Sequence, residues 1–267
     1  MLTDIIVHMD RGAGCTARLM AAIKLASRHG ARLKGLYVIT HPHYTSSSAY
    51  LSDFGQVREF FINATSKAGI EAEWLLVDWA TVGTPLSQVV TSHSYYADTI
   101  LVGQPTQLQS RKTNLDFHES LILGAGRPVV VFPASGEVFQ FGERIMVAWK
   151  GGRESVRAVT DALPFFQTAA DVSIVAAVAN HVEQAQEEQA MSRLQQHLAR
   201  HRVVCRTATI PVQKGNIAEV LLERATLEKV DLMVLGGFAY KSNRAPVLSP
   251  LTQELLIKAP VPLLISH

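Results

Sequence analysis

The sequence contains the same order of segments twice, and this repeat limits the folds that the chain can adopt. Residues 4–133 and 144–267 each alternate short apolar strands with longer segments of helical period. Three pairs of landmarks recur in the same order at a nearly constant offset: Ile5–Asp10 and Ile145–Lys150, Ala97–Gly103 and Val230–Gly236, Arg127–Val131 and Val261–Ile265. A period of roughly 130 residues is too long for a solenoid repeat and suits a whole domain. The sequence therefore indicates an internal duplication of one α/β domain.

Composition excludes several classes of protein. The chain has 267 residues, 48% of them hydrophobic, which is enough for two ordinary cores. Its two cysteines, Cys15 and Cys205, fall at non-equivalent places of the repeat, a helix start and a strand, so we predict two separate reduced thiols. A net charge of +2 without a run of Lys or Arg argues against a nucleic-acid partner. We find no signal-peptide pattern and no apolar run of about 18 residues, so we expect a cytoplasmic protein without a membrane partner.

Alternating strands and helices predict parallel sheets covered on both faces. In the first half, Leu19, Ile23 and Ala26 form a helical stripe, and Gly30 stands where that helix should stop. The predicted fold class is α/β: two tandem doubly wound, Rossmann-like domains, each a five-stranded parallel sheet with helices on both faces. We assign residues 1–133 to the first domain, 134–142 to a linker and 143–267 to the second domain.

Two prolines mark the last strand of each repeat. Pro128 and Pro262 stand at the starts of their strands, where a missing N–H is tolerated, and such strands usually lie at a sheet edge. These edges could pair with each other inside one chain or with a second molecule. The sequence leaves a monomer with intramolecular domain pairing and a homodimer both open.

In a doubly wound sheet, ligands bind at the carboxyl ends of the strands where the strand order reverses. In the second half these turns are Ala148–Gly152 at the end of the first strand, which includes Trp149 and Lys150, and Leu235–Asn243 at the end of the fourth strand. A helix is then expected to open at Ser249–Thr252. We therefore expect the turns after the first and fourth strands to form any binding site.

The three landmark pairs resemble those of a tandem universal stress protein. That family has an opening strand ending in a Val-Asp type pair, a fourth strand of the Ala-Asp-Leu-Ile-Val-Met-Gly type and a closing Cys-Pro-Val-Leu-Val type strand. The corresponding segments here are the landmarks given above, and they span nearly the whole chain. The resemblance implies a stress-response protein. In ATP-binding members, Gly, two residues, Gly, nine residues, Gly and Ser or Thr follow the fourth strand and hold the phosphates.

The second repeat departs from that motif. It has Gly236, then Ala239, then nine residues to Ser249 and Pro250, so one of the three glycines is retained. Ala239 adds a Cβ where the backbone should approach phosphate, and Pro250 has no N–H to donate. We expect Ser249 to cap the helix and nucleotide binding to be weakened. The residues implied for this candidate ligand site are Ala148, Trp149, Lys150, Gly236, Gly237, Ser242, Asn243, Ser249 and Thr252.

The first repeat departs further. Gly103 is retained, but the equivalent of the Gly-Ser pair falls near Asp116–Phe117, where a carboxylate capping the helix would repel phosphate. The resemblance implies that Asp10 accepts a hydrogen bond from adenine or a neighbouring group. Lys150 takes the same place in the second repeat and cannot accept one. Each half therefore lacks a different part of the family's site, with Asp10 and Gly103 as the candidates in the first.

Two further groups of residues carry alternatives. Lys150, Lys241, Arg244 and Lys214 could converge above the second sheet and favour an anion, or they could be ordinary solvated charges. His41 and His43 could serve a metal together with Asp53, but zinc normally needs three or four ligands, so we assign no metal site.

The sequence favours a non-enzymatic, stress-response sensor or partner-binding module with degenerate nucleotide motifs. We expect no cofactor beyond weak ATP or AMP binding, and a small anionic or nucleotide ligand or a protein as partner. The alternative is an ATP- or AMP-binding protein with slow ATPase activity, using the second domain with Lys241 or Arg244 on the phosphates. An adenine-binding relative of the same topology, such as an electron-transfer flavoprotein, is a third reading that fold analogy alone does not exclude.

Overall fold

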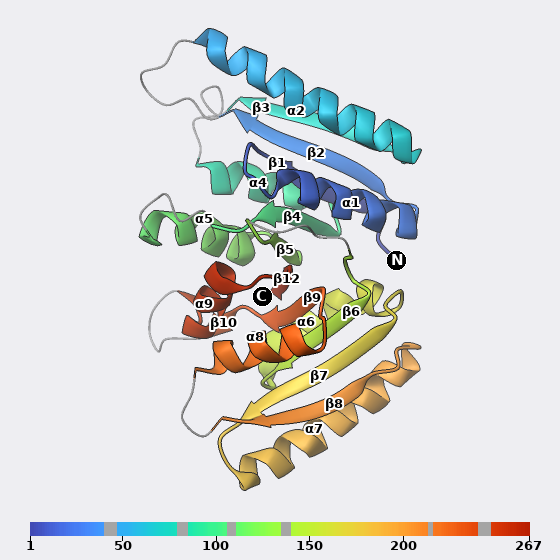
Figure 1. Cartoon of the computed structure of the whole chain (residues 1–267), viewed down its shortest axis with the longest axis vertical. Helices are drawn as coiled ribbons and strands as arrows, with labels where there is room; N and C mark the ends of the chain where they lie inside the picture. Colours follow the sequence, from blue (N-terminus) through green and yellow to red (C-terminus); the bar gives the residue numbers. More distant parts are fainter. Residues whose placement is uncertain (40–46, 79–84, 106–110, 135–139, 213–215, 240–246) are drawn as a thin grey trace. The chain divides into compact units, whose positions relative to one another are not determined.

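The computed structural model describes residues 1–39, 47–78, 85–105, 111–134, 140–212, 216–239 and 247–267. The chain forms two compact units, Met1–Phe139 and Gln140–His267, which follow each other in the colour ramp of Figure 1. Most of the predicted linker, 134–142, lies outside the described residues. Each unit is an α/β domain with a parallel sheet, so the predicted fold class is confirmed.

Unit 1 is built on a five-stranded sheet. Its elements in chain order are β1 Asp4–Met9, α1 Cys15–His29, β2 Arg32–Ile39, α2 Ser47–Ala68, β3 Ala72–Asp78, α4 Leu86–Ser94, β4 Thr99–Gly103, α5 Arg111–Gly124 and β5 Val129–Phe132. The strand order is β3-β2-β1-β4-β5, and every neighbouring pair is parallel. The order reverses between β1 and β4, and the carboxyl ends of the strands at such a reversal are where ligands of this fold bind.

Unit 2 repeats this order with one addition. Its elements are β6 Arg144–Trp149, α6 Gly152–Phe166, β7 Asp171–Val178, α7 His181–Arg200, β8 Arg206–Pro211, α8 Ile217–Leu227, β9 Leu232–Gly236, β10 Phe238–Ala239, β11 Val247–Leu248, α9 Pro250–Lys258 and β12 Leu263–Ser266. The parallel sheet runs β8-β7-β6-β9-β12. The short antiparallel pair β10–β11 follows β9 and was not predicted from the sequence.

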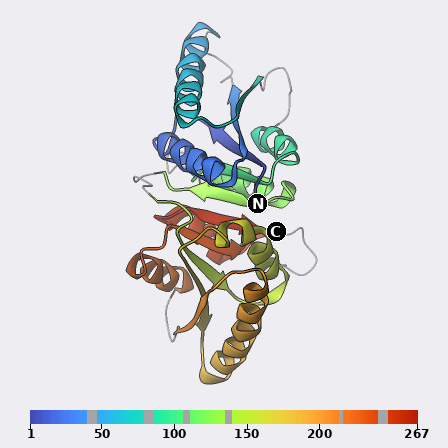
Figure 2. The same ribbon diagram turned by 90° about the vertical axis from the view of Figure 1, so that its right-hand side faces the viewer.

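The helices cover both faces of each sheet. In unit 1, α1 and α2 lie on one face and α4 and α5 on the other; in unit 2, α6 and α7 lie on one face and α8 and α9 on the other (Figure 2). This is the arrangement that right-handed crossovers produce when a strand order reverses in the middle of a sheet. Among the described residues, none of the helices could span a bilayer.

Local sequence signals account for most helix and strand boundaries. Leu19, Ile23 and Ala26 lie on the buried face of α1. Gly30 ends that helix in the left-handed conformation, with φ of 64°. Cys205 lies directly before β8 rather than inside it. Pro128 and Pro262 immediately precede β5 and β12, each at one end of its own unit's order. Whether these two edges pair stays a prediction.

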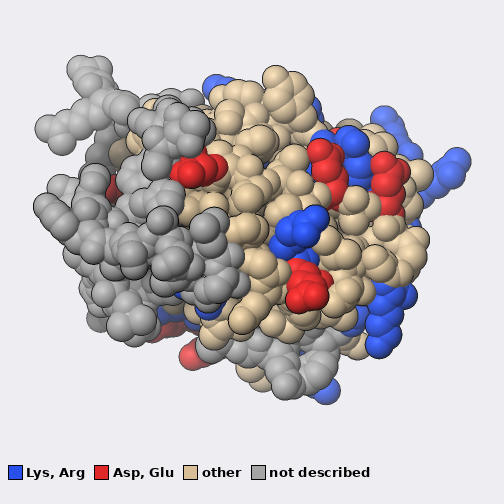
Figure 3. All heavy atoms as spheres, turned by 90° about the horizontal axis from the view of Figure 1, so that it is seen from above, with Lys and Arg blue, Asp and Glu red and all other residues tan. Residues whose placement is uncertain are grey.

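Charged side chains are mixed on the surface seen from above in Figure 3. Lys and Arg side chains there lie beside Asp and Glu side chains, with apolar and uncharged residues between them. The ion pairs of Arg32 with Asp4 and Glu73 are examples of such mixing in unit 1. The described part of this face therefore presents no patch of a single sign of charge.

Candidate functional site

The two candidates of unit 1 lie at the same end of the sheet. Asp10 directly follows β1 and Gly103 ends β4, and these two strands are neighbours in the sheet. A Cβ placed on Gly103 would lie 3.6 Å from the Asp10 Oδ2 atom. The sequence-based expectation that these two residues share one end of the sheet agrees with this geometry.

A buried arginine, which the sequence analysis did not single out, already contacts Asp10. Arg18, on the inner face of α1, is 1% exposed. Its Nη2 atom donates to Asp10 Oδ2 at 2.6 Å and its Nε atom donates to the carbonyl of His8 at 3.0 Å. The backbone N–H of Gly12 donates to the other Asp10 oxygen at 2.7 Å. Both oxygens of the carboxylate therefore accept hydrogen bonds from the chain itself. The sequence feature that could have revealed Arg18 is its position directly before Leu19, a residue of the predicted buried stripe of α1.

Gly103 has a packing role in addition to its place at the end of β4. A Cβ at this position would lie 2.5 Å from Arg18 Nη1, closer than carbon and nitrogen can approach without a shift. The glycine is thus what makes room for the buried guanidinium. The resemblance assigned the same glycine to phosphate approach, and the packing on Arg18 gives a second physical reason for it.

Two histidines lie beside this ion pair. The His8 Nδ1 atom is 3.6 Å from Asp10 Oδ2, and the Nε2 atom of His118 is within hydrogen-bond distance of the Gly103 carbonyl, at 2.7 Å. Burial lowers the pKa of His8 from 6.5 to about 4; the negative charge of Asp10 opposes this shift, and Arg18 and His118 add to it. His8 is therefore held neutral at neutral pH, beside Asp10 and Arg18.

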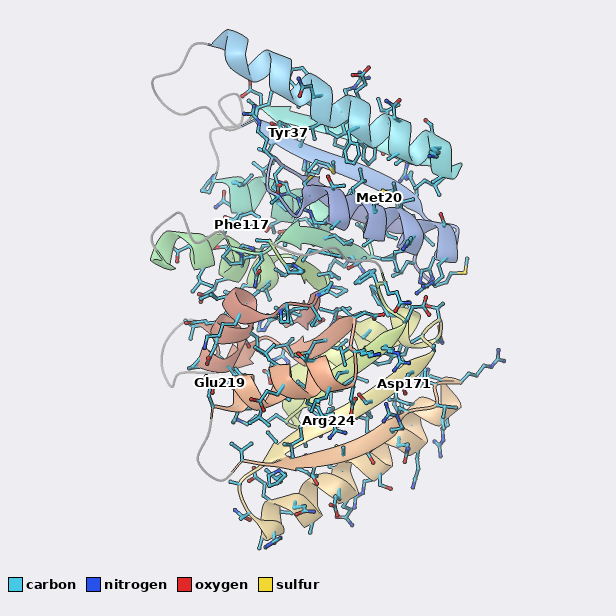
Figure 4. All side chains as sticks on the ribbon, viewed as in Figure 1. Met20, Tyr37, Phe117, Asp171, Glu219 and Arg224 are labelled. Atoms are coloured by element: carbon cyan, nitrogen blue, oxygen red, sulfur yellow. The ribbon has the colours of Figure 1, made fainter. Side chains whose placement is uncertain are left out.

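The helix at this end of unit 1 differs from the expectation. Asp116 lies inside α5, which begins at Arg111, so it does not cap the helix. The spacing of the family motif predicted that this helix starts near Asp116, but α5 starts several residues earlier. The next residue, Phe117, packs against the His8 ring with a centroid distance of 6.2 Å. Phe117, labelled in Figure 4, therefore covers the His8 ring from the α5 side.

A cavity of about 280 Å³ adjoins Asp10. It lies between the ends of β1 and β2 and the start of α4, and Tyr37, labelled in Figure 4, comes from β2. Its lining mixes apolar side chains with one carboxylate, one guanidinium, one neutral imidazole and a phenol: His8, Met9, Asp10, Arg11, Tyr37, Val38, Ile39 and Leu86. Such a cavity can hold a small, largely apolar ligand oriented by a few polar groups.

In unit 2 the equivalent strand end is closed by an indole. Ala148 is half-buried, Trp149 is 8% exposed and Lys150 is exposed at the end of β6. The Trp149 Nε1 atom is buried without a hydrogen-bond partner in the described part of the chain. Trp149 thus packs in the core, and the exposed Lys150 follows it directly in the chain.

Gly236 is fixed by helix packing. A Cβ at Gly236 would lie 2.6 Å from the backbone carbonyl carbon of Glu154, in the first turn of α6. Since backbone atoms cannot rotate away as a side chain can, α6 can lie this close to β9 only over a glycine. Exchange of Gly236 for a bulky residue would therefore disturb the fold and cannot serve as a clean test of ligand binding.

The backbone groups expected to hold phosphate in unit 2 already have partners within the chain. The Gly237 N–H donates to the Ser266 carbonyl at 3.0 Å, and the Ser249 N–H donates to the Gly237 carbonyl at 3.2 Å. Ser249 caps α9 as predicted, because its Oγ atom accepts from the Thr252 N–H at 3.0 Å. Pro250 occupies the first helical position and has no N–H. These donors are used by the fold itself.

Several predicted residues cannot be placed. Lys214, Lys241, Ser242, Asn243, Arg244, His41 and His43 lie outside the described residues, as does the side chain of Asp53. The proposed convergence of basic groups above the second sheet and the two-histidine loop therefore stay predictions.

Comparisons with known proteins show which solved structures share this fold. No protein-family model matches the sequence, and no curated protein matches it significantly. A universal stress protein from Archaeoglobus fulgidus DSM 4304 superposes with a TM-score of 0.72 at 14% identity, covering 99% of this chain and 96% of that chain. A protein of unknown function from Pseudomonas aeruginosa PAO1 gives 0.65 at 14% identity, covering 99% and 92%. The cytoplasmic domain of a prokaryotic cation chloride cotransporter gives 0.51 at 12% identity, covering 99% and 95%.

Proposed function

From the tandem universal stress protein fold of this chain, we propose that the protein is a non-enzymatic stress-response sensor whose unit 1 cavity binds a small ligand and whose phosphate-binding motifs are degenerate. The fold alone does not decide this, since a transporter domain shares it. The proposal depends on what occupies the carboxyl edges of the two sheets.

The observation that carries the proposal is the set of backbone donors in unit 2. An anion at a helix N-terminus needs N–H groups that point at it and have no other acceptor. Here the N–H groups of Gly237, Ser249 and Thr252 all donate within the chain, and Pro250 has none. A triphosphate held by the N–H groups of Gly237, Ser249 and Thr252 would have to break these bonds, and each exchange would return little net energy.

Unit 1 supports the same conclusion by a different route. The Asp10 carboxylate is held by Arg18 and Gly12, but its side chain is still 33% exposed and lines the cavity. It can accept a further hydrogen bond from a ligand N–H or O–H, and a carboxylate repels a phosphate placed against it. This favours a small ligand with hydrogen-bond donors. Asp10 is paired with Arg18 and burial holds His8 neutral, so we propose a binding role and no catalytic role for this site.

The first test measures nucleotide binding. Titration of ATP and of AMP into the purified chain should give dissociation constants weaker than about 1 mM. The double variant Ala239→Gly, Pro250→Ser should improve these constants by less than tenfold, because the N–H groups of Gly237 and Thr252 keep their partners. A constant in the micromolar range for the unmodified chain, with slow ATP hydrolysis, would instead favour the nucleotide-binding alternative.

The second test locates the ligand. Small molecules released by denaturing fresh protein should be identified by mass spectrometry for the unmodified chain, for Leu86→Trp and for Leu227→Trp. Leu86 lines the cavity and Leu227 is 80% exposed on unit 2, so only the first exchange fills the site. A molecule lost from Leu86→Trp and kept in Leu227→Trp supports the proposal. Adenine nucleotide retained near one per chain in both variants contradicts it.

A further inference from the structure

Helix α7 of unit 2 ends with two histidines one helical turn apart. The imidazole rings of His197 and His201 have a centroid distance of 4.8 Å and an angle of 64° between their planes. His197 is exposed and His201 is partly exposed. Residues four apart lie on the same side of a helix, so the two rings project from one side of α7.

The backbone under the second ring is held in place. His201 is the residue that ends α7, with φ of −88° and ψ of 9°, and its N–H donates to the Leu198 carbonyl at 2.9 Å. The Gln167 side chain, which follows α6, donates to the His201 carbonyl at 3.3 Å. Binding of a ligand to the two rings would therefore restrict little more than the side-chain torsions of the two histidines, so the entropic cost of binding is small.

The separation of the rings matches that of two imidazoles on one metal ion. With metal–nitrogen bonds of about 2.0–2.1 Å, imidazoles at neighbouring positions of a tetrahedral or octahedral ion have centroids roughly 4.5–5 Å apart. We propose that His197 and His201 together bind a divalent transition metal ion that prefers imidazole and keeps other ligand positions for water, such as Ni²⁺ or Cu²⁺. Among the described residues no group of three or more metal-ligating side chains occurs, so water or a donor from another molecule completes the coordination.

The charges near the site act in opposite directions. The last carbonyl groups of a helix carry partial negative charge, and a cation at the end of α7 is favoured by them. Arg193, Arg200 and Arg202 lie within one turn of the two histidines along the chain and disfavour a cation. Three full positive charges outweigh a partial charge of roughly half an elementary charge at the helix end. Because salt screens both effects and does not screen the metal–nitrogen bonds, the affinity should rise with ionic strength.

The test is calorimetric titration of Ni²⁺ into untagged protein at pH 7.5. The background is the variant His41→Ala, His43→Ala, which removes the other pair of closely spaced histidines. In that background, His197→Ala and His201→Ala should each lower the association constant at least about tenfold, because chelation by a second tethered ligand is lost. The matched control His181→Ala removes an exposed histidine at the other end of the same helix and should leave the constant unchanged.

Two results would overturn the assignment. One is an association constant that is the same in His197→Ala and His201→Ala as in the background. The other is a constant that falls by the same factor in His181→Ala. Circular dichroism of each variant checks that α7 is retained. A rise in affinity when NaClO₄ is increased from 50 to about 500 mM supports the site beside the three arginines, and a fall contradicts it.

Discussion

Arg18 brings a positive charge into the interior of unit 1, where it is 1% exposed and bonded to Asp10 and to the His8 carbonyl. Asp10 is less buried, with 33% of its side chain exposed. The energetic cost of losing the partner should therefore be larger for Arg18 than for Asp10. Loss of the carboxylate leaves a fully buried guanidinium uncompensated, whereas loss of the guanidinium leaves a carboxylate that water can reach.

This asymmetry predicts the outcome of a double-mutant cycle. Asp10→Ala should lower the free energy of unfolding by about 3 kcal/mol. Asp10→Ala combined with Arg18→Met should cost less than Asp10→Ala alone, because the buried charge is removed as well. Urea unfolding of the four proteins measures both quantities. Additive effects of the two substitutions would show that the pair does not stabilise the fold through its charges.

His8 gives a second prediction at the residue scale, for the pH dependence of stability. Its pKa is lowered from 6.5 in the unfolded chain to about 4 in the folded chain, chiefly by burial. The unfolded state therefore takes up the proton first as pH falls. Relative to His8→Asn, the unmodified protein should be unaffected above pH 6.5 and should lose up to about 3 kcal/mol between pH 6.5 and 4. Parallel stability curves for the two proteins over this range would contradict the assignment.

At the scale of elements, the contact of α6 with β9 depends on Gly236. Gly236→Ala should lower the free energy of unfolding by about 1–3 kcal/mol, since the new methyl group would meet the Glu154 backbone. Gly103→Ala should cost less, because the obstacle there is the end of the Arg18 side chain. Gly55→Ala in α2 meets no atom of the described residues within 4 Å and should stabilise the protein by about 0.5–1 kcal/mol. Chemical denaturation of the three variants gives this order, and equal costs at Gly236 and Gly103 would contradict it.

Elements also show where transfer from a sequence motif succeeded and failed. The cap formed by Ser249 and Pro250 was predictable, because it is a local pattern of three or four residues. The assignment of Asp116 to a helix start was wrong, because α5 begins at Arg111 and the spacing of the motif does not fix that boundary. The pair β10–β11 was missed, since two-residue strands carry no periodic signal.

At the scale of the whole molecule, each unit contains a complete five-stranded sheet and its own buried core. Residues 1–139 and 140–267 expressed separately should therefore each fold and unfold cooperatively, as domains of this size do. Circular dichroism during urea unfolding measures this. A half that stays unfolded alone would show that its core depends on the other half.

Mixing the two separate halves tests the prediction about the proline-marked edges. If the strands that follow Pro128 and Pro262 pair with each other, the halves should form a one-to-one complex by size-exclusion chromatography with light scattering. If they pair with second copies, each half should form a homodimer and the intact chain should be dimeric.

The sequence by itself determined the duplication, the α/β class, the parallel strands and the ends of the sheets at which Asp10, Gly103, Lys150 and Gly236 lie. All of these follow from periodicity and chain order, which are properties of short segments. Only the tertiary structure decided which partners those residues have. Arg18 reaches Asp10 because α1 packs across β1 and β4. The N–H groups of Gly237 and Ser249 donate to carbonyl groups that are distant along the chain. A buried hydrogen-bond donor pairs with an acceptor that the tertiary fold brings close to it. A local sequence pattern does not contain this information, because the acceptor can lie far away along the chain.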